Sequence, residues 1–394
     1  MPGRLKMILA GLVVLVACCV APATAANKIK IGYIATMSGP AASLGQDILD
    51  GFKLGIVHAG NALGGLPVEL IVGDDQLKPE VGVQVASKMV EKDKVDFITG
   101  VVFSNVMMAI AQPVTEAGVF LISANAGPSP LAGAGCLPNL FTVSWQNDQT
   151  HEAMGKYLQD KGVQHLYLMA PNYQAGKDAL AGVKRYFKGE IVGEVYTTLN
   201  QLDYAAELAQ LRAAKPEAVF AFYPGGMGIN FVKQYAQMGL KEEIPFYAPA
   251  FTVDHTLLPA QGEAALGIIN SSFWSPDLPN PVNQKFVTGF QQTYARIPSL
   301  FAAQGYDAAL FIDSAVRAVG GDLRDKDQLR TALRKASFAS VRGIFKLNHN
   351  HFPIQDFYIC QVVRKADGVI TQELQGIAFK DHADAYHEQC SMRW

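Results

Sequence analysis

The sequence predicts an α/β protein made of two doubly wound lobes. Short runs rich in Ile, Val and Phe alternate with helical patterns along almost the whole chain, and this alternation indicates parallel sheets with right-handed crossovers. The series of strands and helices occurs twice, with a loop and a helix after corresponding strands. Because 394 residues also exceed what one ordinary core accommodates, we expect two lobes of like topology.

Residues 1–25 have the pattern of a secretory signal peptide. Basic residues precede an apolar run from Met7 to Ala21, and Ala23-Thr24-Ala25 supplies an A-x-A cleavage site. The run is shorter than the roughly 20 residues that span a bilayer. We therefore expect export to the periplasm, where ATP and NAD are absent. Leu15-Val16-Ala17-Cys18 also resembles a lipoprotein cleavage box, which leaves a lipid anchor at Cys18 as the alternative.

The charge of the chain argues against nucleic acid as a partner. The net charge is −2, and loss of Arg4 and Lys6 with the signal peptide takes it to −4. No later apolar run is long enough to span a bilayer. We expect no nucleic-acid or membrane-spanning role for the exported chain.

The first series of elements predicts a sheet flanked by helices. The expected strands are short and rich in Ile, Val and Phe: Lys28–Ala35, Val68–Asp74, Asp96–Val102 and Val119–Ala124. The expected helices lie between them: Leu44–Ala59, Pro79–Lys92 and Asn105–Ala117. Pro79 suits a first helical position, and Glu80 suits the positive end of the helix dipole.

The second series follows the same plan. Its expected strands are His165–Ala170, Ile191–Leu199, Ala218–Tyr223, Pro245–Pro249 and Ile268–Trp274. Its expected helices are Thr150–Asp160, Gly176–Phe187, Tyr204–Ala213 and Ile229–Met238. Three further helices come next: Pro281–Ala295, Phe301–Val319 and Asp327–Lys335. The tail predicts a hairpin of 357–364 with 369–379, because Asp367-Gly368 lies between two alternating runs.

The order of these elements predicts where the chain passes from one lobe to the other. We expect crossings near Ser144–Trp145, Phe273–Ser275 and Phe345–Asn350, which together form a three-strand hinge. The first lobe then comprises residues 26–144 and 276–346, and the second lobe residues 145–275 and 347–394. A hinge of three strands leaves a cleft between the lobes.

Three cysteines remain after export: Cys136, Cys360 and Cys390. An oxidising compartment permits one disulfide among them. We expect Cys360 to pair with Cys390, because both lie in the C-terminal tail. The other two pairings remain open.

Two glycine-containing loops lie where a strand passes into a helix, at 38–45 and 223–228. Free N–H groups and a helix N-terminus make such places suited to a phosphate or a carboxylate. A glycine turn without ligand contact is the alternative. Neither loop has the G-x-G-x-x-G spacing, and no P-loop motif is present, so the sequence disfavours a dinucleotide.

Further candidate ligand contacts follow strands of the first lobe. Ser104 offers a hydroxyl and 125–127 offer backbone groups to an anion in the cleft, although Ser104 is also a suitable helix N-cap. Aromatic residues gather at the ends of strands and at crossings, which favours an apolar cleft. They are Phe103, Trp145, Tyr173, Tyr223, Phe251, Phe273 and Trp274.

No catalytic motif is present. The chain lacks a G-x-S-x-G elbow, an H-E-x-x-H helix and paired C-x-x-C motifs. His349 and His351 alternate, but a metal site needs further ligands that the sequence does not place. We expect no cofactor, no metal and no enzymatic activity, with an exported enzyme as a distant alternative.

The chain resembles the periplasmic leucine/isoleucine/valine-binding family, the type I solute-binding proteins of ABC importers. The resemblance covers nearly all of the exported sequence. Its carriers, in order, are Ile31–Pro40 with Gly45, Asp74-Asp75, Ser104 after the strand that ends at Gly100, Leu121–Ala126 and Tyr306-Asp307-Ala308. The resemblance implies the type I periplasmic-binding-protein fold, two Rossmann-like lobes, and an ABC permease as partner of a monomeric receptor.

The resemblance also implies a ligand site. In the family, a serine at the position of Ser104 and backbone groups matching Asn125, Ala126 and Gly127 hold the ligand carboxylate, and a tyrosine matching Tyr173 lies opposite. The acidic residue that receives the ammonium of an amino acid is replaced here by Ala250. A buried ammonium without a partner costs several kcal/mol, so the sequence disfavours amino acids.

The remaining features predict a small aromatic carboxylate, benzoate-like or hydroxycinnamate-like. The Ser-Trp-Gln-Asn-Asp run at 144–148 resembles family members that bind such acids, and Leu44 is apolar where a polar or aromatic residue is common. The alternative is a branched-chain amino acid or amide receptor, which an inward-facing Asp254 or Glu263 would favour. The candidate ligand-binding residues are Ser43, Leu44, Phe103, Ser104, Asn125, Ala126, Gly127, Trp145, Tyr173, Tyr223, Ala250, Phe251 and Thr252.

Overall fold

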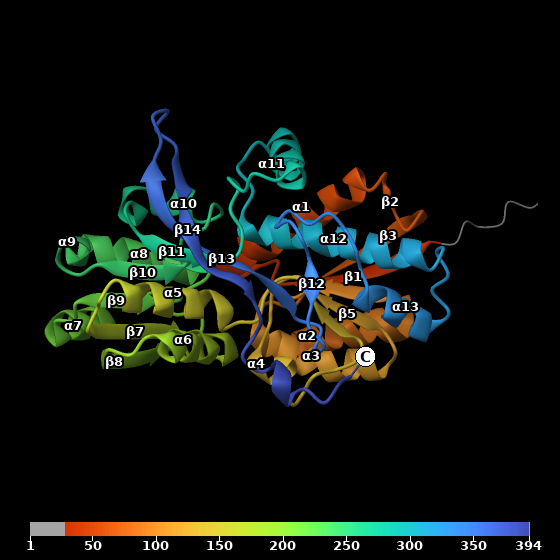
Figure 1. Ribbon diagram of the computed structural model, residues 1–394, viewed down its shortest axis with the longest axis horizontal. Coiled ribbons are helices and arrows are strands. Elements are labelled where there is room, and N and C mark those ends of the chain that lie inside the picture. The colour runs from red at the N-terminus through yellow and green to blue at the C-terminus, as the bar shows by residue number, and fades with distance from the viewer. Residues whose placement is uncertain (1–27, 394) are drawn as a thin grey trace, which may run out of the picture.

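The computed structural model describes residues 28–393. The expected signal peptide and the alternative lipid anchor at Cys18 lie outside the described residues. Figure 1 shows two lobes side by side, each with a sheet covered by helices. The sheets run almost entirely parallel where they form the lobe centres. This is the type I periplasmic-binding-protein architecture that the sequence predicts.

The sheet of the first lobe has six strands in the order β2-β3-β1-β4-β5-β6. Its strands are β1 (Ile29–Ala35), β2 (Ala62–Leu63), β3 (Leu66–Asp74), β4 (Phe97–Gly100), β5 (Phe120–Ser123) and β6 (Leu140–Thr142). Its helices from this part of the chain are α1 (Ala42–His58), α2 (Pro79–Lys88), α3 (Ser104–Glu116) and α4 (Ser129–Ala132). Strands β4 and β5 are buried along their whole length, which explains why they read as continuous apolar runs.

The sheet of the second lobe has eight strands in the order β12-β13-β11-β10-β9-β7-β8, with β14 beside β13. Its strands are β7 (His165–Pro171), β8 (Glu190–Thr197), β9 (Ala218–Ala221), β10 (Phe246–Pro249), β11 (Ile269–Ser272), β12 (Lys346–Leu347), β13 (Pro353–Arg364) and β14 (Ile370–His382). Its helices are α5 (Gln149–Asp160), α6 (Gln174–Tyr186), α7 (Ala205–Ala214), α8 (Gly226–Gln237), α9 (Leu240–Glu243) and α10 (Leu258–Gln261).

Three helices of the later chain lie over the first lobe: α11 (Pro281–Tyr294), α12 (Leu300–Ala318) and α13 (Lys326–Arg334). Their bounds agree with the predicted helices to within one residue. The predicted hairpin is also confirmed, because β13 and β14 pair antiparallel from Gln355–His382 to Arg364–Ile370. Asn280 caps α11 by accepting a hydrogen bond from the Asn283 backbone at 2.8 Å.

The chain passes between the lobes three times. The first crossing, 143–148, joins β6 to α5, and the second, 273–280, joins β11 to α11. The third crossing is the first part of β13, because His351, just before this strand, stacks on Phe141 of β6, whereas Tyr358 pairs with Ser272 of β11. These three segments are the hinge.

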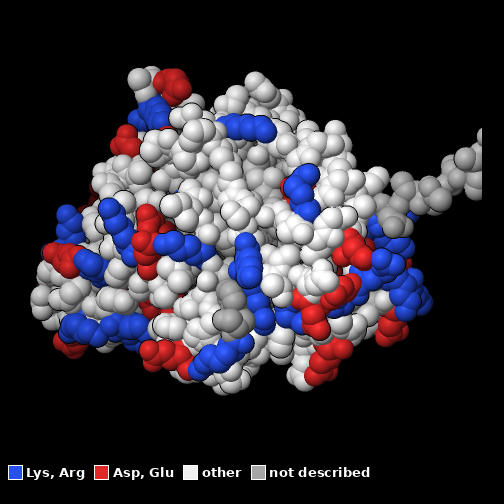
Figure 2. Space-filling view, turned by 45° about the vertical axis from the view of Figure 1, so that its right-hand side comes forward, with Lys and Arg blue, Asp and Glu red and all other residues white. Residues whose placement is uncertain are grey.

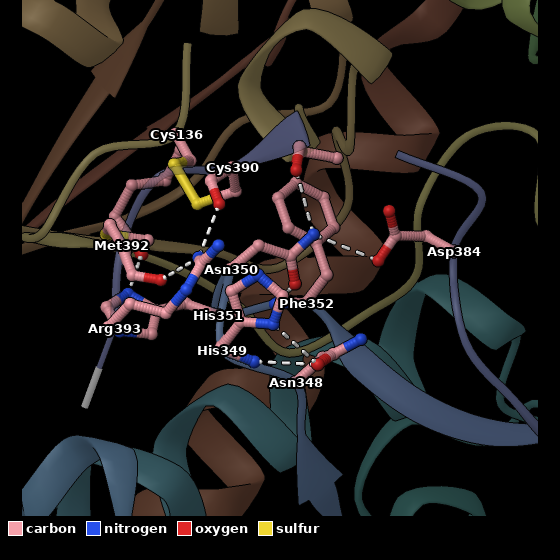
Figure 3. The surroundings of a disulfide bond; sticks show 12 residues. Cys136, Asn348, His349, Asn350, His351, Phe352, Asp384, Cys390, Met392 and Arg393 are labelled. Carbon is pink, nitrogen blue, oxygen red and sulfur yellow. Dashed lines mark hydrogen bonds between the residues drawn. A yellow bond between two sulfur atoms is a disulfide. The ribbon is translucent and has the colours of Figure 1, made fainter. Parts of the chain in front are cut away.

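The predicted disulfide is wrong. Cys390 bonds to Cys136, with 5.7 Å between their Cα atoms, and Cys360 is a free, buried thiol. Cys360 lies in the middle of β13, whose central position in the sheet keeps it away from the tail. Beyond β14 the chain turns toward the first lobe, so Cys390 meets the loop that holds Cys136 (Figure 3).

In the part of the chain that the structure describes, the helices are all too short or too polar to cross a membrane. On the face drawn in Figure 2, Lys and Arg side chains are interspersed with Asp and Glu instead of forming one broad basic surface.

Candidate functional site

A cavity between the lobes brings together most of the predicted ligand contacts. It is narrow in this structure, with a cavity volume of about 20 Å³. Strand ends, helix starts and the first crossing supply its walls, which is where open α/β sheets bind ligands. The residues that line it are Leu44, Val102, Phe103, Ser104, Asn125, Ala126, Trp145, Asn147, Tyr173, Ala175, Phe222, Pro224, Phe251 and Phe301.

Two helices from opposite lobes begin at the cavity. Helix α3 starts at Ser104 with Phe103 as its N-cap, and α6 starts at Gln174 with Tyr173 as its N-cap. The side chain of neither N-cap residue accepts a hydrogen bond from the backbone of its helix. The first backbone N–H groups of both helices therefore lack a side-chain cap. Two positive helix ends therefore face one small space, which favours a negative ligand group.

Ser104 does not act as an N-cap, one of the two roles that we considered for it. It is the first helical residue, and its hydroxyl oxygen accepts a hydrogen bond from Asn147 Nδ2 at 3.0 Å. The same Asn147 nitrogen donates to Asp178 Oδ2 at 2.9 Å. Among the described residues, none accepts the hydroxyl proton of Ser104. That proton is available to a ligand oxygen.

Backbone groups of 126 and 127, which we expected at the ligand, are engaged within the protein. Ala126 N donates to Val101 O at 3.1 Å, and Gly127 N donates to Asn147 Oδ1 at 3.0 Å. Asn147 N in turn donates to Gly127 O at 2.8 Å. Asn147 thus joins the loop after β5 to the first crossing. It also lines the cavity, although we did not predict it as a ligand contact from the sequence.

Aromatic rings form most of the remaining wall. The Trp145 and Phe251 rings stack with centroids 4.4 Å apart and planes 26° apart. The Phe301 and Phe251 rings meet edge-on with centroids 5.6 Å apart, and the centroids of the Tyr173 and Phe103 rings lie 6.1 Å apart. Such rings present flat apolar surfaces at which a ligand ring can stack or make edge contacts.

Three polar atoms on this wall have no hydrogen-bond partner among the described residues. Trp145 Nε1 and Asn125 Oδ1 are buried and unpaired, and the Tyr173 hydroxyl makes no hydrogen bond within the described chain. Burial, together with the charge of Asp178, raises the pKa of Tyr173, so the hydroxyl stays protonated. The cavity therefore offers two neutral donors and one neutral acceptor besides Ser104.

None of the described residues that line the cavity carries a charged side chain. Asp254 is buried, but its carboxylate accepts hydrogen bonds from the backbone N–H groups of Thr256 at 2.8 Å and Leu300 at 3.0 Å. Glu263 is exposed and pairs with Arg364. Neither acid replaces the missing partner for a ligand ammonium.

Eight of the thirteen predicted contacts line the cavity: Leu44, Phe103, Ser104, Asn125, Ala126, Trp145, Tyr173 and Phe251. The other five do not. Ser43 is exposed in a separate depression beside Asp47 and Thr256. Gly127 is bonded to Asn147, and Ala250 is buried beside Phe251 without reaching the cavity wall.

Tyr223 and Thr252 lie behind the wall, and the alternation of side chains explains Tyr223. Successive residues of an extended segment face opposite sides, so Phe222 lines the cavity while Tyr223 packs on Phe231 with centroids 4.7 Å apart. The Tyr223 hydroxyl accepts from Thr197 at 3.2 Å. The Thr252 hydroxyl accepts from the Tyr223 backbone N–H at 2.9 Å.

Sequence reasoning missed six lining residues: Val102, Asn147, Ala175, Phe222, Pro224 and Phe301. Asn147 belongs to the Ser-Trp-Gln-Asn-Asp run that we had noted, and Phe222 is the neighbour of a chosen tyrosine. Phe301 enters from α12, far along the chain, and no local pattern marks it.

The two glycine-containing loops meet each other across the cleft. Gly225 has φ 64°, and a Cβ there would lie 3.3 Å from Ala41 Cα. A Cβ on Gly226 would lie 2.6 Å from Pro40 Cβ. These glycines allow the lobes to approach closely, and only Leu44 and Pro224 of the two loops line the cavity.

His349 and His351 do not belong to a metal-ligating group within the described residues. The His351 ring stacks on Phe141 with centroids 4.0 Å apart, and its Nδ1 lies 2.9 Å from Leu140 O. Burial lowers the pKa of His351 to about 3, which suits a neutral ring in a core.

Two doubly wound lobes, a three-segment hinge and a cavity between them define a solute-binding receptor of the kind that serves ABC importers. The chain belongs to the periplasmic binding protein family, whose model matches residues 28–368. Membership of this family implies a periplasmic location.

Solved structures of similar proteins carry aromatic acids. A solute-binding protein of an ABC transporter from R. palustris, in complex with benzoate, is 34% identical with a TM-score of 0.88, covering 93% of this chain and 100% of that one. Another from Rhodopseudomonas palustris BisB5, in complex with 3,4-dihydroxy benzoic acid, is 31% identical with a TM-score of 0.85, covering 91% and 99%.

Among curated proteins, the Leu/Ile/Val-binding protein homolog 6 of Brucella melitensis is 28% identical over 357 residues. That match covers 88% of this chain and 91% of the relative. The similarity therefore extends over both lobes.

Proposed function

We propose that this protein is the receptor of an ABC importer for a small aromatic carboxylate, benzoate-like or hydroxycinnamate-like, and that it is not an enzyme. One observation carries the proposal: the cavity between the lobes has aromatic walls and neutral polar atoms, and no described residue in its lining is charged. The aromatic acids bound by the similar R. palustris proteins support it.

The carboxylate end of the proposed ligand lies at Ser104. Its hydroxyl proton is available because Asn147 donates to its oxygen, and the first N–H groups of α3 lie at the same place. Hydrogen bonds to a charged group contribute about 1.5–3 kcal/mol each. A carboxylate is held here by donors and helix ends without a countercharge.

The ring of the proposed ligand packs against the aromatic wall. Trp145 and Phe251 supply stacked faces, and Phe222 and Phe301 supply edges. A hydroxyl on the ligand ring forms a hydrogen bond with the Tyr173 hydroxyl or donates one to the unpaired Asn125 Oδ1. An aliphatic amino acid would leave its ammonium in this apolar space without a carboxylate, at a cost of several kcal/mol.

The proposal has three further parts. The chain is exported by means of residues 1–25, it acts as a monomer, and it delivers the ligand to an ABC permease. Closure of the lobes about the hinge buries the ligand and creates a joined surface for the permease. N-terminal sequencing of the periplasmic protein and its elution in size-exclusion chromatography check the first two statements.

Calorimetric titration of the purified protein tests the ligand class. We expect benzoate, 4-hydroxybenzoate or 4-coumarate to bind, benzamide to bind weakly because it has no charge, and leucine and isoleucine to give no heat. Tight binding of leucine without binding of any aromatic acid would contradict the proposal. NMR spectra of the ligand before and after incubation test the enzyme alternative, because turnover would change them.

A further inference from the structure

Arg342 lies in the first lobe, between α13 and β12, and contacts all three segments of the hinge. Its side chain is 7% exposed. Its guanidinium donates to two backbone carbonyls of the first crossing, Val143 O and, at 2.8 Å, Ser144 O. It also lies 5.5 Å from the centroid of the Phe273 ring at the start of the second crossing.

The same guanidinium connects the two lobes. Its Nε donates at 3.0 Å to Asp307 Oδ2 on α12 of the first lobe, and its Nη1 donates to Gln355 Oε1 in the third crossing, where β13 enters the second lobe. Gln355 Nε2 donates to Ser144 O at 2.7 Å, so two side chains share that carbonyl. The planar, five-donor fork of an arginine suits this arrangement, whereas a lysine offers three donors at one point.

The hinge contacts continue into the ligand cavity. Trp145, which lines the cavity, follows Ser144 directly in the chain. Its ring also stacks on Phe273 with centroids 6.3 Å apart and planes 17° apart. Arg342 therefore contacts both the residue before Trp145 and the ring behind it.

We propose that Arg342 is a positioning residue: it holds the three crossings at one mutual angle and thereby places Trp145 against the ligand. Rotation of the lobes requires the crossings to twist relative to one another, and the guanidinium joins all of them at one point. Loss of the fork spreads the ligand-free protein over more lobe angles. The binding-competent fraction falls, and the apparent affinity falls with it. The effect on affinity rests on the proposed function, whereas the effect on lobe angle does not.

Arg342→Met tests this inference, because it keeps much of the apolar stem and removes all donors. Arg342→Lys retains the charge, and Gln355→Leu removes the second contact to Ser144 O. Arg212→Met is the matched control, since the Arg212 guanidinium bonds within the second lobe, to Glu243 and Met238 O. Circular dichroism and thermal melts establish that each variant is folded.

Two measurements complete the test. Spin labels at Lys53→Cys in α1 and Lys233→Cys in α8, both exposed, report the distance between the lobes without ligand. Stopped-flow titration with benzoate and 4-hydroxybenzoate reports binding rates. We expect Arg342→Met to broaden the ligand-free distance distribution and to weaken affinity about tenfold. Arg342→Lys and Gln355→Leu should give distance distributions and affinities between those of Arg342→Met and the wild type. The control should match the wild type in both measurements.

An unchanged distance distribution in folded Arg342→Met and Gln355→Leu would overturn the inference. Failure of the wild type to bind any aromatic acid would overturn the proposed function instead, and the ligand-free distances would still decide the role of Arg342. If Arg342→Met does not fold, the Lys and Leu variants carry the same comparison.

Discussion

Asn147 Nδ2 donates one hydrogen bond to Ser104 Oγ at 3.0 Å and another to Asp178 Oδ2 at 2.9 Å. The first bond makes the serine oxygen an acceptor within the protein, so the serine proton is available to the cavity. The second fixes the orientation of the amide by a buried carboxylate. A single side chain from the first crossing thus prepares the donor at which the ligand carboxylate is proposed to bind.

Ser104→Ala removes that donor. We expect affinity for benzoate to fall about 10- to 100-fold, which corresponds to one hydrogen bond to a charged group, while the melting temperature changes little. Calorimetry measures the affinity. Ser314→Ala is the control, because its hydroxyl bonds to Ser337 O on the outer side of α12. Equal affinities of Ser104→Ala and the wild type would place the carboxylate elsewhere.

The alternation of Phe222 and Tyr223 predicts opposite outcomes for neighbouring substitutions. Phe222→Leu removes a ring from the cavity wall, so affinity for aromatic acids falls about 2- to 10-fold. Tyr223→Phe removes only a hydroxyl that accepts from Thr197, so it lowers stability by about 1 kcal/mol and leaves affinity unchanged. Titration and urea unfolding of both variants check this. The reverse pattern would put Tyr223 at the ligand.

The Cys136–Cys390 disulfide fastens the tail that follows the second lobe to the first lobe. Asn350 Nδ2, near the same place, donates to Ala132 O at 2.8 Å and to Asp384 at 3.0 Å (Figure 3). The double substitution Cys136→Ser with Cys390→Ser should lower the free energy of unfolding by about 2–5 kcal/mol, measured by urea unfolding.

Thiol titration distinguishes this disulfide from the pairing that we first expected. Burial raises the pKa of Cys360 to about 12, so its thiol reacts slowly in the folded protein. In protein lacking residues 1–25, we expect no fast-reacting thiol when folded and one when unfolded without reductant. Mass spectrometry of a non-reduced digest should join the peptides of Cys136 and Cys390. A peptide pair containing Cys360 would contradict the structure.

Asp254 gives the protein a pH-dependent stability of defined sign. Burial, with the nearby charge of Asp47, raises the pKa of Asp254 to about 7, above the value of about 3.9 in an unfolded chain. Between these values the folded protein holds a proton that the unfolded chain has lost. Its contribution to the free energy of unfolding therefore falls as pH rises from 4 to 7, by at most about 1.4 kcal/mol per unit.

Asp254→Asn removes this titration. Urea unfolding at several pH values should show that the wild type loses stability relative to the variant as pH rises from 4 to 7. Asp313→Asn is a control, since that carboxylate lies in the first lobe beside Arg317. Parallel pH curves for the wild type and Asp254→Asn would show that Asp254 does not titrate in this range.

Local patterns predicted most of the fold. Apolar runs marked the parallel strands because both faces of such strands are buried, and Asp367-Gly368 marked the hairpin because few other pairs suit a tight turn. The ends of helices were predicted less accurately than their presence. Helix α8 begins at Gly226, three residues before the predicted start, because Gly225 with φ 64° turns the chain there.

The candidate site was predictable where a residue follows a strand end, as Ser104, Asn125 and Trp145 do. It was not predictable for Phe301, which reaches the cavity only because α12 packs against α1. Whether Phe222 or Tyr223 lines the cavity depends on which face of the extended segment points inward. Strand β9 before them has four residues, too few for its sequence pattern to specify that face.

The sequence by itself determined the number of lobes, their alternating elements, the residues at the strand ends and the absence of an acid at position 250. These are properties of short segments, and local hydrophobicity and turn chemistry encode them. Only the tertiary structure decided the Cys136–Cys390 pairing, the bond from Asn147 to Ser104 and the meeting of three crossings at Arg342. Each of these joins segments far apart in the chain, and their proximity arises from packing of the lobes, which no local pattern specifies.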